Sequence, residues 1–122
     1  MKIRINGNSI RYRLSKPEVD KMCLSGKISN EINFGDNQLK YSLVAQENID
    51  QLTAQYLKGE IIIFIPSNYL TDWTTNDTVG FENTIELENQ EILKILIEKD
   101  FKCLDNSSED QSDNFENPNQ TC

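Results

Sequence analysis

The sequence predicts an α+β fold, mainly β, in which a duplicated ββαββ unit forms a pseudo-twofold barrel of eight short strands and two short helices, followed by an acidic tail. Three observations lead to this prediction. One run typical of a buried strand lies near the middle of the chain, apolar and polar residues alternate along much of its length, and the order of elements is repeated. We take residues 1–101 as one domain with repeat units 1–46 and 51–98, and residues 102–122 as the tail.

The centre of the predicted fold is the strand Glu60–Pro66. It contains a run of large apolar residues, 61–65, in which every side chain is β-branched or aromatic. Lys58-Gly59 and Pro66 bound the run, and its short length and the proline disfavour a helix. We therefore expect a strand that is buried on both faces.

Eight strands are predicted from alternating apolar and polar residues and from the turn residues between them. Successive side chains of a strand point to opposite faces, so that most of these segments have one apolar face. In chain order, the predicted strands cover residues 1–5, 10–14, 28–34, 39–45, 52–56, 60–66, 79–87 and 92–97.

Two short helices are predicted where the alternation stops. The first begins with Ser15 and Glu18 at the spacing of a capping box and ends at Gly26. Cys23 is expected on its apolar face as a small buried residue. The second helix, over residues 67–73, follows directly after the central strand.

The order strand, strand, helix, strand, strand occurs twice. At an offset of 51 residues, the apolar residues of the first two strands fall on those of the fifth and sixth, and Met22 falls on Trp73. An offset of 52 then places Tyr41 of the fourth strand on Leu93 of the eighth. Few residues are identical, so that the repeat is one of pattern, and we interpret it as an internal duplication.

Short motifs in each half carry a resemblance. They are Gly7-Asn8-Ser9 with Ile10–Leu14 before a capped helix, and Ile63–Pro66 with Asn76–Val79 after a short helix. Each half resembles the swapped-hairpin barrel unit of the AbrB/SpoVT regulators and MazE-type antitoxins. In that superfamily two units interlock into one barrel, usually as a homodimer, and DNA-binding members use basic residues of the first hairpin. The resemblance implies a single-chain barrel here.

The whole chain is also similar to a small, uncharacterised bacterial family, a domain of unknown function. The similarity lies in the opening segment Lys2–Arg11 and in Glu98–Phe101, followed by the acidic tail that ends in Cys122. This second resemblance implies no function.

The composition disfavours several classes of protein. The chain has no histidine, the commonest general base and a common metal ligand. Its three cysteines are an odd, small number without an export signal, which argues against a disulfide scaffold, and the absence of a CxxC motif argues against a zinc site. No apolar run approaches the roughly 20 residues of a membrane span. We expect a cytoplasmic protein that is not an enzyme, without metal, cofactor or membrane segment.

The candidate binding residues are four cations of the first hairpin, namely Lys2, Arg4, Arg11 and Arg13. A period of two places all four on the face away from the core. Like charges on neighbouring strands repel, so that such a cluster favours an anion. We expect an acidic partner segment or the chain's own tail as the ligand. The structural alternative is a solvated face, or one neutralised by acidic residues of the domain.

An AbrB-like DNA-binding regulator is the alternative function. The second half of the chain argues against a symmetric DNA-binding surface, because it has Ile62 and Phe64 where the first hairpin has Arg11 and Arg13. Residues 51–122 also carry fourteen acidic and four basic side chains, which phosphates would repel. Nucleic acid is therefore not the favoured partner, and an enzyme or a metal-binding protein is a third, less favoured alternative.

A second candidate surface is apolar. Ile62 and Phe64 would lie on the outer face of the central strand, and Ile92 and Leu96 pose the same question on the last strand. Exposed side chains of this kind would form a partner or homodimer interface. The alternative is cover from within the chain, and both a monomer and a homodimer fit the pattern.

The tail has the composition of a solvated segment. Residues 103–122 carry five acidic and no basic side chains, which is typical of disorder. The alternatives are packing on the domain, an acidic arm over the arginine face, or a cation site. The carboxylate spacing does not fit an EF-hand loop, and zinc binding by Cys103 and Cys122 would need further ligands.

Overall fold

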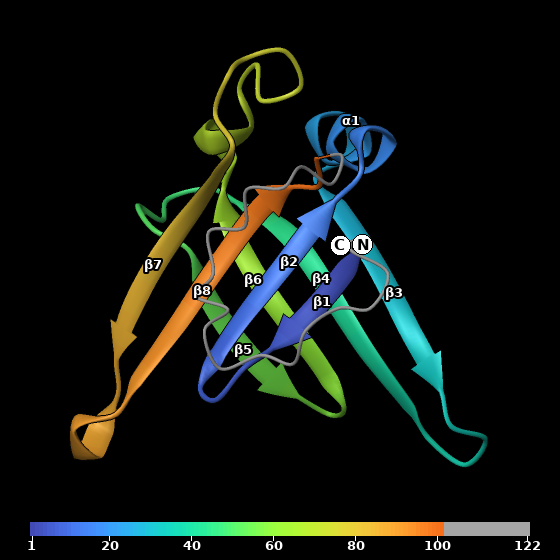
Figure 1. Ribbon diagram of the computed structural model, residues 1–122, viewed down its shortest axis with the longest axis vertical. Coiled ribbons are helices and arrows are strands. Elements are labelled where there is room, and N and C mark those ends of the chain that lie inside the picture. The colour runs from blue at the N-terminus through green and yellow to red at the C-terminus, as the bar shows by residue number, and fades with distance from the viewer. Residues whose placement is uncertain (102–122) are drawn as a thin grey trace, which may run out of the picture.

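The computed structural model describes residues 1–101 as two four-stranded sheets, one α-helix and two short 3-10 turns (Figure 1). The elements are β1 (Lys2–Ile5), β2 (Ser9–Leu14), α1 (Lys16–Ser25), β3 (Lys27–Asn33), β4 (Gln38–Gln46), β5 (Thr53–Leu57), β6 (Glu60–Pro66), η1 (Ser67–Leu70), β7 (Gly80–Glu86), η2 (Glu88–Gln90) and β8 (Ile92–Lys99). The prediction of a mainly β fold with eight strands is confirmed for this part of the chain. The predicted acidic tail, with Cys103 and Cys122, lies outside the described residues.

Each sheet joins two hairpins through a central parallel pair. The strand orders are β1-β2-β8-β7 and β3-β4-β6-β5, with β2 parallel to β8 and β4 parallel to β6. We call them the front and the back sheet, as they lie in Figure 1, where their strands cross at a large angle. Each sheet takes one hairpin from each half of the chain, so that the two halves interlock.

The predicted barrel is not closed. Within residues 1–101 no strand pairing joins the front sheet to the back sheet. Side chains connect the two sheets instead: Tyr41 Oη donates to Met1 O at 3.0 Å, and Asn83 Nδ2 donates to Leu52 O at 2.9 Å. Strands β1 and β5 are short, with 4 and 5 residues, and the β3–β4 and β7–β8 hairpins extend away from them (Figure 1). Alternation predicts which face a strand buries, but it says nothing about whether two sheet edges meet.

The hydrophobic core lies between the two sheets. Its main strand residues are Tyr12, Leu14, Leu43, Ile61, Ile63, Ile65, Ile95 and Ile97. Tyr12 Oη donates to Ile61 O at 3.3 Å, and burial raises the pKa of the Tyr12 phenol far above its usual range. Ile62 and Phe64 on the other face of β6 are only half-buried, so that the prediction of a strand buried on both faces is wrong.

Helix α1 and the segment after β6 lie at the same end of the sheets (Figure 1). Val19 and Met22 are the buried residues of α1, whereas Cys23 is exposed, contrary to prediction. The buried stripe is narrow because α1 packs only against the end of the sheets. The predicted second helix is shorter than expected, a 3-10 turn over Ser67–Leu70, and Trp73 follows it in a turn and is fully buried.

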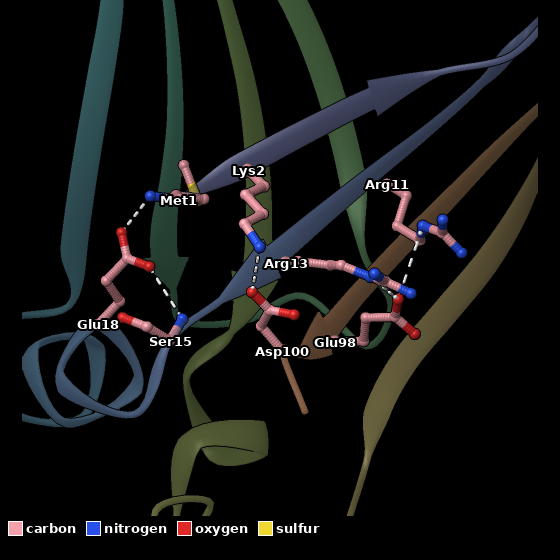
Figure 2. Close-up of polar contacts among 8 residues, drawn as sticks. All are labelled: Met1, Lys2, Arg11, Arg13, Ser15, Glu18, Glu98 and Asp100. Atoms are coloured by element: carbon pink, nitrogen blue, oxygen red, sulfur yellow. Dashed lines mark hydrogen bonds and ion pairs between the residues drawn. The ribbon is translucent and has the colours of Figure 1, made fainter. Parts of the chain in front are cut away.

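Glu18 connects the start of α1 to Met1 (Figure 2). One carboxylate oxygen accepts the Ser15 N–H at 2.8 Å, and the other pairs with the Met1 amine. Partial burial favours the protonated acid, but hydrogen bonds from the Met1 amine and from Ser15 outweigh it and lower the pKa of Glu18 below its ordinary value. The ionised carboxylate therefore stabilises the fold.

Because the pKa of Glu18 is lower in the folded than in the unfolded state, its contribution is present above the ordinary value of 4.5 and is lost as the pH falls through the folded value. We expect Glu18→Gln to lower the free energy of unfolding at pH 7 and to flatten its decline between pH 5 and 3. Urea unfolding at several pH values measures this, with Glu47→Gln on the exposed surface as control. The same pH slope in Glu18→Gln and wild type would contradict it.

Candidate anion-binding site

The first hairpin places the four predicted cations on the outer face of the front sheet. Lys2 lies opposite Arg13 and Arg4 lies opposite Arg11 in the register of β1 and β2. The alternate residue Tyr12 is buried in the core. The structure therefore brings together all four cations that the sequence singled out.

Side chains from four strands form rows across this outer face. Strand registers define the rows as Lys2, Arg13, Glu98 and Gly80; then Arg4, Arg11, Leu96 and Glu82; then Ser9, Lys94 and Thr84. We call the cations Lys2, Arg4, Arg11, Arg13 and Lys94 the basic face. Lys94 joins it because β8 pairs in parallel with β2.

Acidic residues at the end of β8 neutralise part of the first row (Figure 2). Arg13 Nε lies 2.7 Å from Glu98 Oε1, and Arg11 Nε lies 3.6 Å from the same oxygen. Lys2 Nζ lies 2.7 Å from Asp100 Oδ2. The side chains of Arg11 and Glu98 are only 14% and 16% exposed, so that solvent screens this pair less than a surface pair. Neutralisation by acidic residues of the domain is therefore realised in the first row and extends to Arg11 of the second row.

A hollow of about 220 Å³ lies over the second and third rows. Its polar lining includes Arg4, Asn6, Ser9, Arg11, Glu82, Thr84 and Lys94. The lining has three cations and one carboxylate, and Glu98 beside Arg11 offsets one more cation, so that these residues together still carry a net positive charge at neutral pH. Guanidinium groups bind carboxylates and phosphates through paired hydrogen bonds, and nearby hydroxyls can donate further ones. The lining is therefore suited to an anionic group of the size of a carboxylate or a phosphate.

The predicted apolar residues lie in two separate places. Ile62 and Phe64 are half-buried on the outer face of the back sheet, where Val44 is in register with Phe64. On the front sheet, Leu96 is half-buried and lines the hollow, whereas Ile92 is 46% exposed at the start of β8. Leu96 thus belongs to the candidate anion site.

A second hollow, of about 270 Å³, lies between α1 and the end of β8. Lys16, Asp20, Lys99 and Asp100 line it together with the exposed Phe101. Its two positive and two negative side chains give it no preference for one sign of charge. We therefore place the candidate site at the first hollow.

Residues 1–101 contain neither a cluster of metal ligands nor a helix suited to cross a membrane. Within this range, no group of three or more Cys, Asp or Glu side chains is placed to hold a metal ion. Over the same residues, none of the helices has the length and apolar character needed to cross a membrane.

Sequence reasoning missed Lys94, Glu82 and Thr84 of the hollow and the role of Glu98. The parity of β8 puts Lys94 on the same face as Leu96, which was the available signal. The pairing of β2 with β8 was needed to bring that face beside the arginines, and it joins residues more than 80 positions apart, as in Arg13 and Glu98. The motif resemblance to interlocked hairpins was the one pointer to such a pairing.

The fold and the site define a small two-sheet protein with a cationic hollow on one outer face. The chain belongs to DUF7009, a family of unknown function, whose model matches residues 1–119. This agrees with the predicted similarity to an uncharacterised family. No curated protein and no solved structure matches the chain. The resemblance of each half to AbrB and MazE proteins stays a prediction.

Proposed function

We propose that the protein is a non-catalytic binding module that recognises an acidic protein segment through its basic face. The observation that carries this proposal is the hollow, in which Arg4, Arg11 and Lys94 from three strands surround one space of about 220 Å³. Like charges at neighbouring positions of a sheet repel each other, and a bound carboxylate would relieve this repulsion. Ser9 and Thr84 add hydroxyl donors to the lining.

An acidic peptide fits this face better than duplex DNA does. Glu82, Glu98 and Asp100 lie among or beside the cations and would repel the continuous negative charge of a DNA backbone. A peptide can place one carboxylate in the hollow and keep its other side chains away from these acids. The extended backbone of a peptide also matches the spacing of the rows, because both repeat every two residues.

An internal duplication, which we propose as the origin of the fold, supports one site per chain. Lys2 pairs with Arg13 in the β1–β2 hairpin, and Thr53 pairs with Phe64 in the β5–β6 hairpin. Both members of the first pair fall on the second at the predicted offset of 51 residues. The first two strands of each unit therefore correspond as the sequence pattern suggests.

The last two strands of each unit correspond at different positions from those predicted. Ala45 N–H donates to Gly26 O at 2.8 Å, and Lys99 N–H donates to Val79 O at 2.9 Å. If the two units share an origin, these similar contacts support a match of Gly26 with Val79 and of Ala45 with Lys99. The two units then differ in the length of the segment after the second strand.

The parallel pairs give the same correspondence. Ile10 lies opposite Ile95 in the front sheet, and Ile61 lies opposite Tyr41 in the back sheet. Tyr41 therefore corresponds to Ile95, whereas sequence alignment had placed it on Leu93. A shift of two residues preserves the alternation of a strand, which explains why the pattern did not distinguish the two alignments.

The two units have diverged at the site. Under this correspondence Arg11 matches Ile62, and Lys94 matches Lys40. Lys40 Nζ lies 3.9 Å from Glu60 Oε2. The outer face of the back sheet therefore has apolar and paired residues where the front sheet has the basic face. This asymmetry favours one acidic ligand for each chain.

We expect the double variant Arg4→Gln/Arg11→Gln to bind a fluorescein-labelled polyglutamate peptide at least about tenfold more weakly than wild type. Each charged hydrogen bond contributes roughly 1.5–3 kcal/mol, and tenfold in affinity corresponds to about 1.4 kcal/mol. Fluorescence anisotropy at low and physiological salt measures the affinity. Binding should also weaken with added salt, because the contacts are electrostatic.

The matched control is Lys21→Gln/Lys27→Gln, which removes the same charge from exposed positions outside the basic face. Far-UV circular dichroism checks that each variant is folded. Equal affinity of wild type and the arginine variant, or binding that does not respond to salt, would overturn the proposed function. Tighter binding of random duplex DNA than of polyglutamate would favour the DNA-binding alternative.

A further inference from the structure

We infer that residues 102–122 bind the basic face of their own chain and compete there with an acidic partner. This inference rests on the proposed function, because it names the regulation of the same site. Three observations carry it, namely the place where the chain leaves the front sheet, the charge of the segment that follows, and the distance that this segment must span.

The chain leaves the front sheet beside the first row of the basic face. Asp100 N–H donates to Leu14 O at 2.8 Å, which fixes the chain at the end of β2. The Asp100 side chain pairs with Lys2 at 2.7 Å (Figure 2). Asp100, which directly precedes the last described residue, therefore lies beside the cations, at the end of the sheet where the rows begin.

The segment is complementary in charge to the basic face. Residues 103–122 contain no Lys or Arg, and their acidic residues are Asp105, Glu109, Asp110, Asp113 and Glu116. Arg4 and Lys94 line the hollow over the second and third rows, next to the first row in which Glu98 pairs with Arg13 and Asp100 with Lys2. The segment supplies carboxylates that could enter this hollow.

The segment is long enough to reach the hollow. Successive rows on one strand are two residues apart, or about 7 Å, and Asp100 lies two residues beyond Glu98 of the first row, so that the second row lies about 14 Å from Asp100. The five residues from Asp100 to Asp105 span up to about 17 Å when extended. Asp105 can therefore reach Arg4 and Arg11. The acidic residues after Asp105 are separated from Asp100 by a longer stretch of chain and can reach them as well.

A short connection makes even a weak contact effective. A segment joined by a short flexible linker has an effective concentration in the millimolar range. If its carboxylates bind the hollow with a Kd of about 0.1 mM, a segment at about 1 mM weakens a competing ligand about tenfold. Acidic partners would then need to bind more tightly than the chain's own segment in order to displace it.

The test uses the full chain with a neutral segment, the variant D105N/E109Q/D110N/D113N/E116Q. A charge-matched control, E31Q/D36N/E47Q/D50N/D77N, changes five acids that are exposed in the domain. We expect the neutral segment to shift the Nε–Hε resonances of Arg4 and Arg11 in ¹⁵N-resolved spectra. We also expect it to tighten polyglutamate binding about tenfold relative to the control.

Two other outcomes separate the two proposals. If polyglutamate binds through Arg4 and Arg11 with equal affinity in the neutral variant and the control, and their resonances do not shift, the proposed function stands and this inference is overturned. If the resonances shift but polyglutamate binds to neither protein, the contact is purely intramolecular. That result would overturn the proposed function, and the competition with it.

Discussion

Trp73→Ala should lower the free energy of unfolding by about 3–5 kcal/mol, the range for removal of a large buried aromatic side chain. Trp73 is fully buried, and its ring centroid lies 5.1 Å from that of Phe81 on β7. Its indole Nε1 donates to Thr78 O at 2.9 Å, and Lys99 Nζ lies 5.8 Å from the ring centroid. The indole therefore fixes the segment after η1 to the end of the core.

Urea unfolding followed by far-UV circular dichroism measures this loss, because the variant lacks the chain's single tryptophan as a fluorophore. Trp73→Phe is the matched control, since it keeps an aromatic ring against Phe81 but removes the indole N–H. Its expected loss is smaller than that of the alanine variant. A loss below about 1 kcal/mol for Trp73→Ala would show that this end of the core does not depend on the indole.

Gly80→Ala should destabilise the protein by about 2 kcal/mol or more, because the added methyl group has no space. A Cβ at this position would lie 2.3 Å from Ile97 O and 2.9 Å from Glu98 Cα. Both are backbone atoms of β8, which cannot move away without disturbing the pairing of β7 with β8. Urea unfolding of the variant gives the change in free energy.

Gly7→Ala is the control for a glycine with free space around it. No heavy atom lies within 4 Å of a Cβ at Gly7, whose φ of +59° costs an alanine roughly 1–2 kcal/mol through backbone strain. Because Glu98 is in register with Gly80, the Gly80 variant should also move the Arg13 side-chain resonances, and Gly7→Ala should not. A stable Gly80 variant with unchanged Arg13 resonances would contradict the steric account.

Local patterns predicted the strands better than they predicted how the sheets meet. The predicted bounds of β6, Glu60–Pro66, are those found in the structure. A short run of β-branched and aromatic residues between a Gly turn and a proline favours a strand with these ends over any other element. The open sheet edges were not predicted, because closure of a barrel depends on the way in which the long β3–β4 and β7–β8 hairpins twist relative to the short edge strands β1 and β5. Cys23 was misplaced for a similar reason, since the width of the buried stripe on α1 depends on what the helix covers.

The candidate site could be predicted in part. The face shared by Arg4 and Arg11 follows from a period of two and from the turn between their strands. Lys94 and the acceptor Glu98 come from β8, a strand near the other end of the domain. The register in which β8 pairs with β2 cannot be predicted from the residues within either strand. The hollow therefore became visible only once the pairing of distant hairpins was known.

The interlocked strand order also has a consequence for protein synthesis. The back sheet uses the continuous stretch from β3 to β6, residues 27–66, whereas the front sheet needs β1 and β2 together with β7 and β8. On a ribosome, the first hairpin emerges long before its partner strand, and a nascent chain that lacks β8 has neither Lys94 nor Glu98 beside the arginines. The basic face is thus incomplete in an unfinished polypeptide, and only a chain synthesised through β8 can carry all five of its cations with the acceptor Glu98.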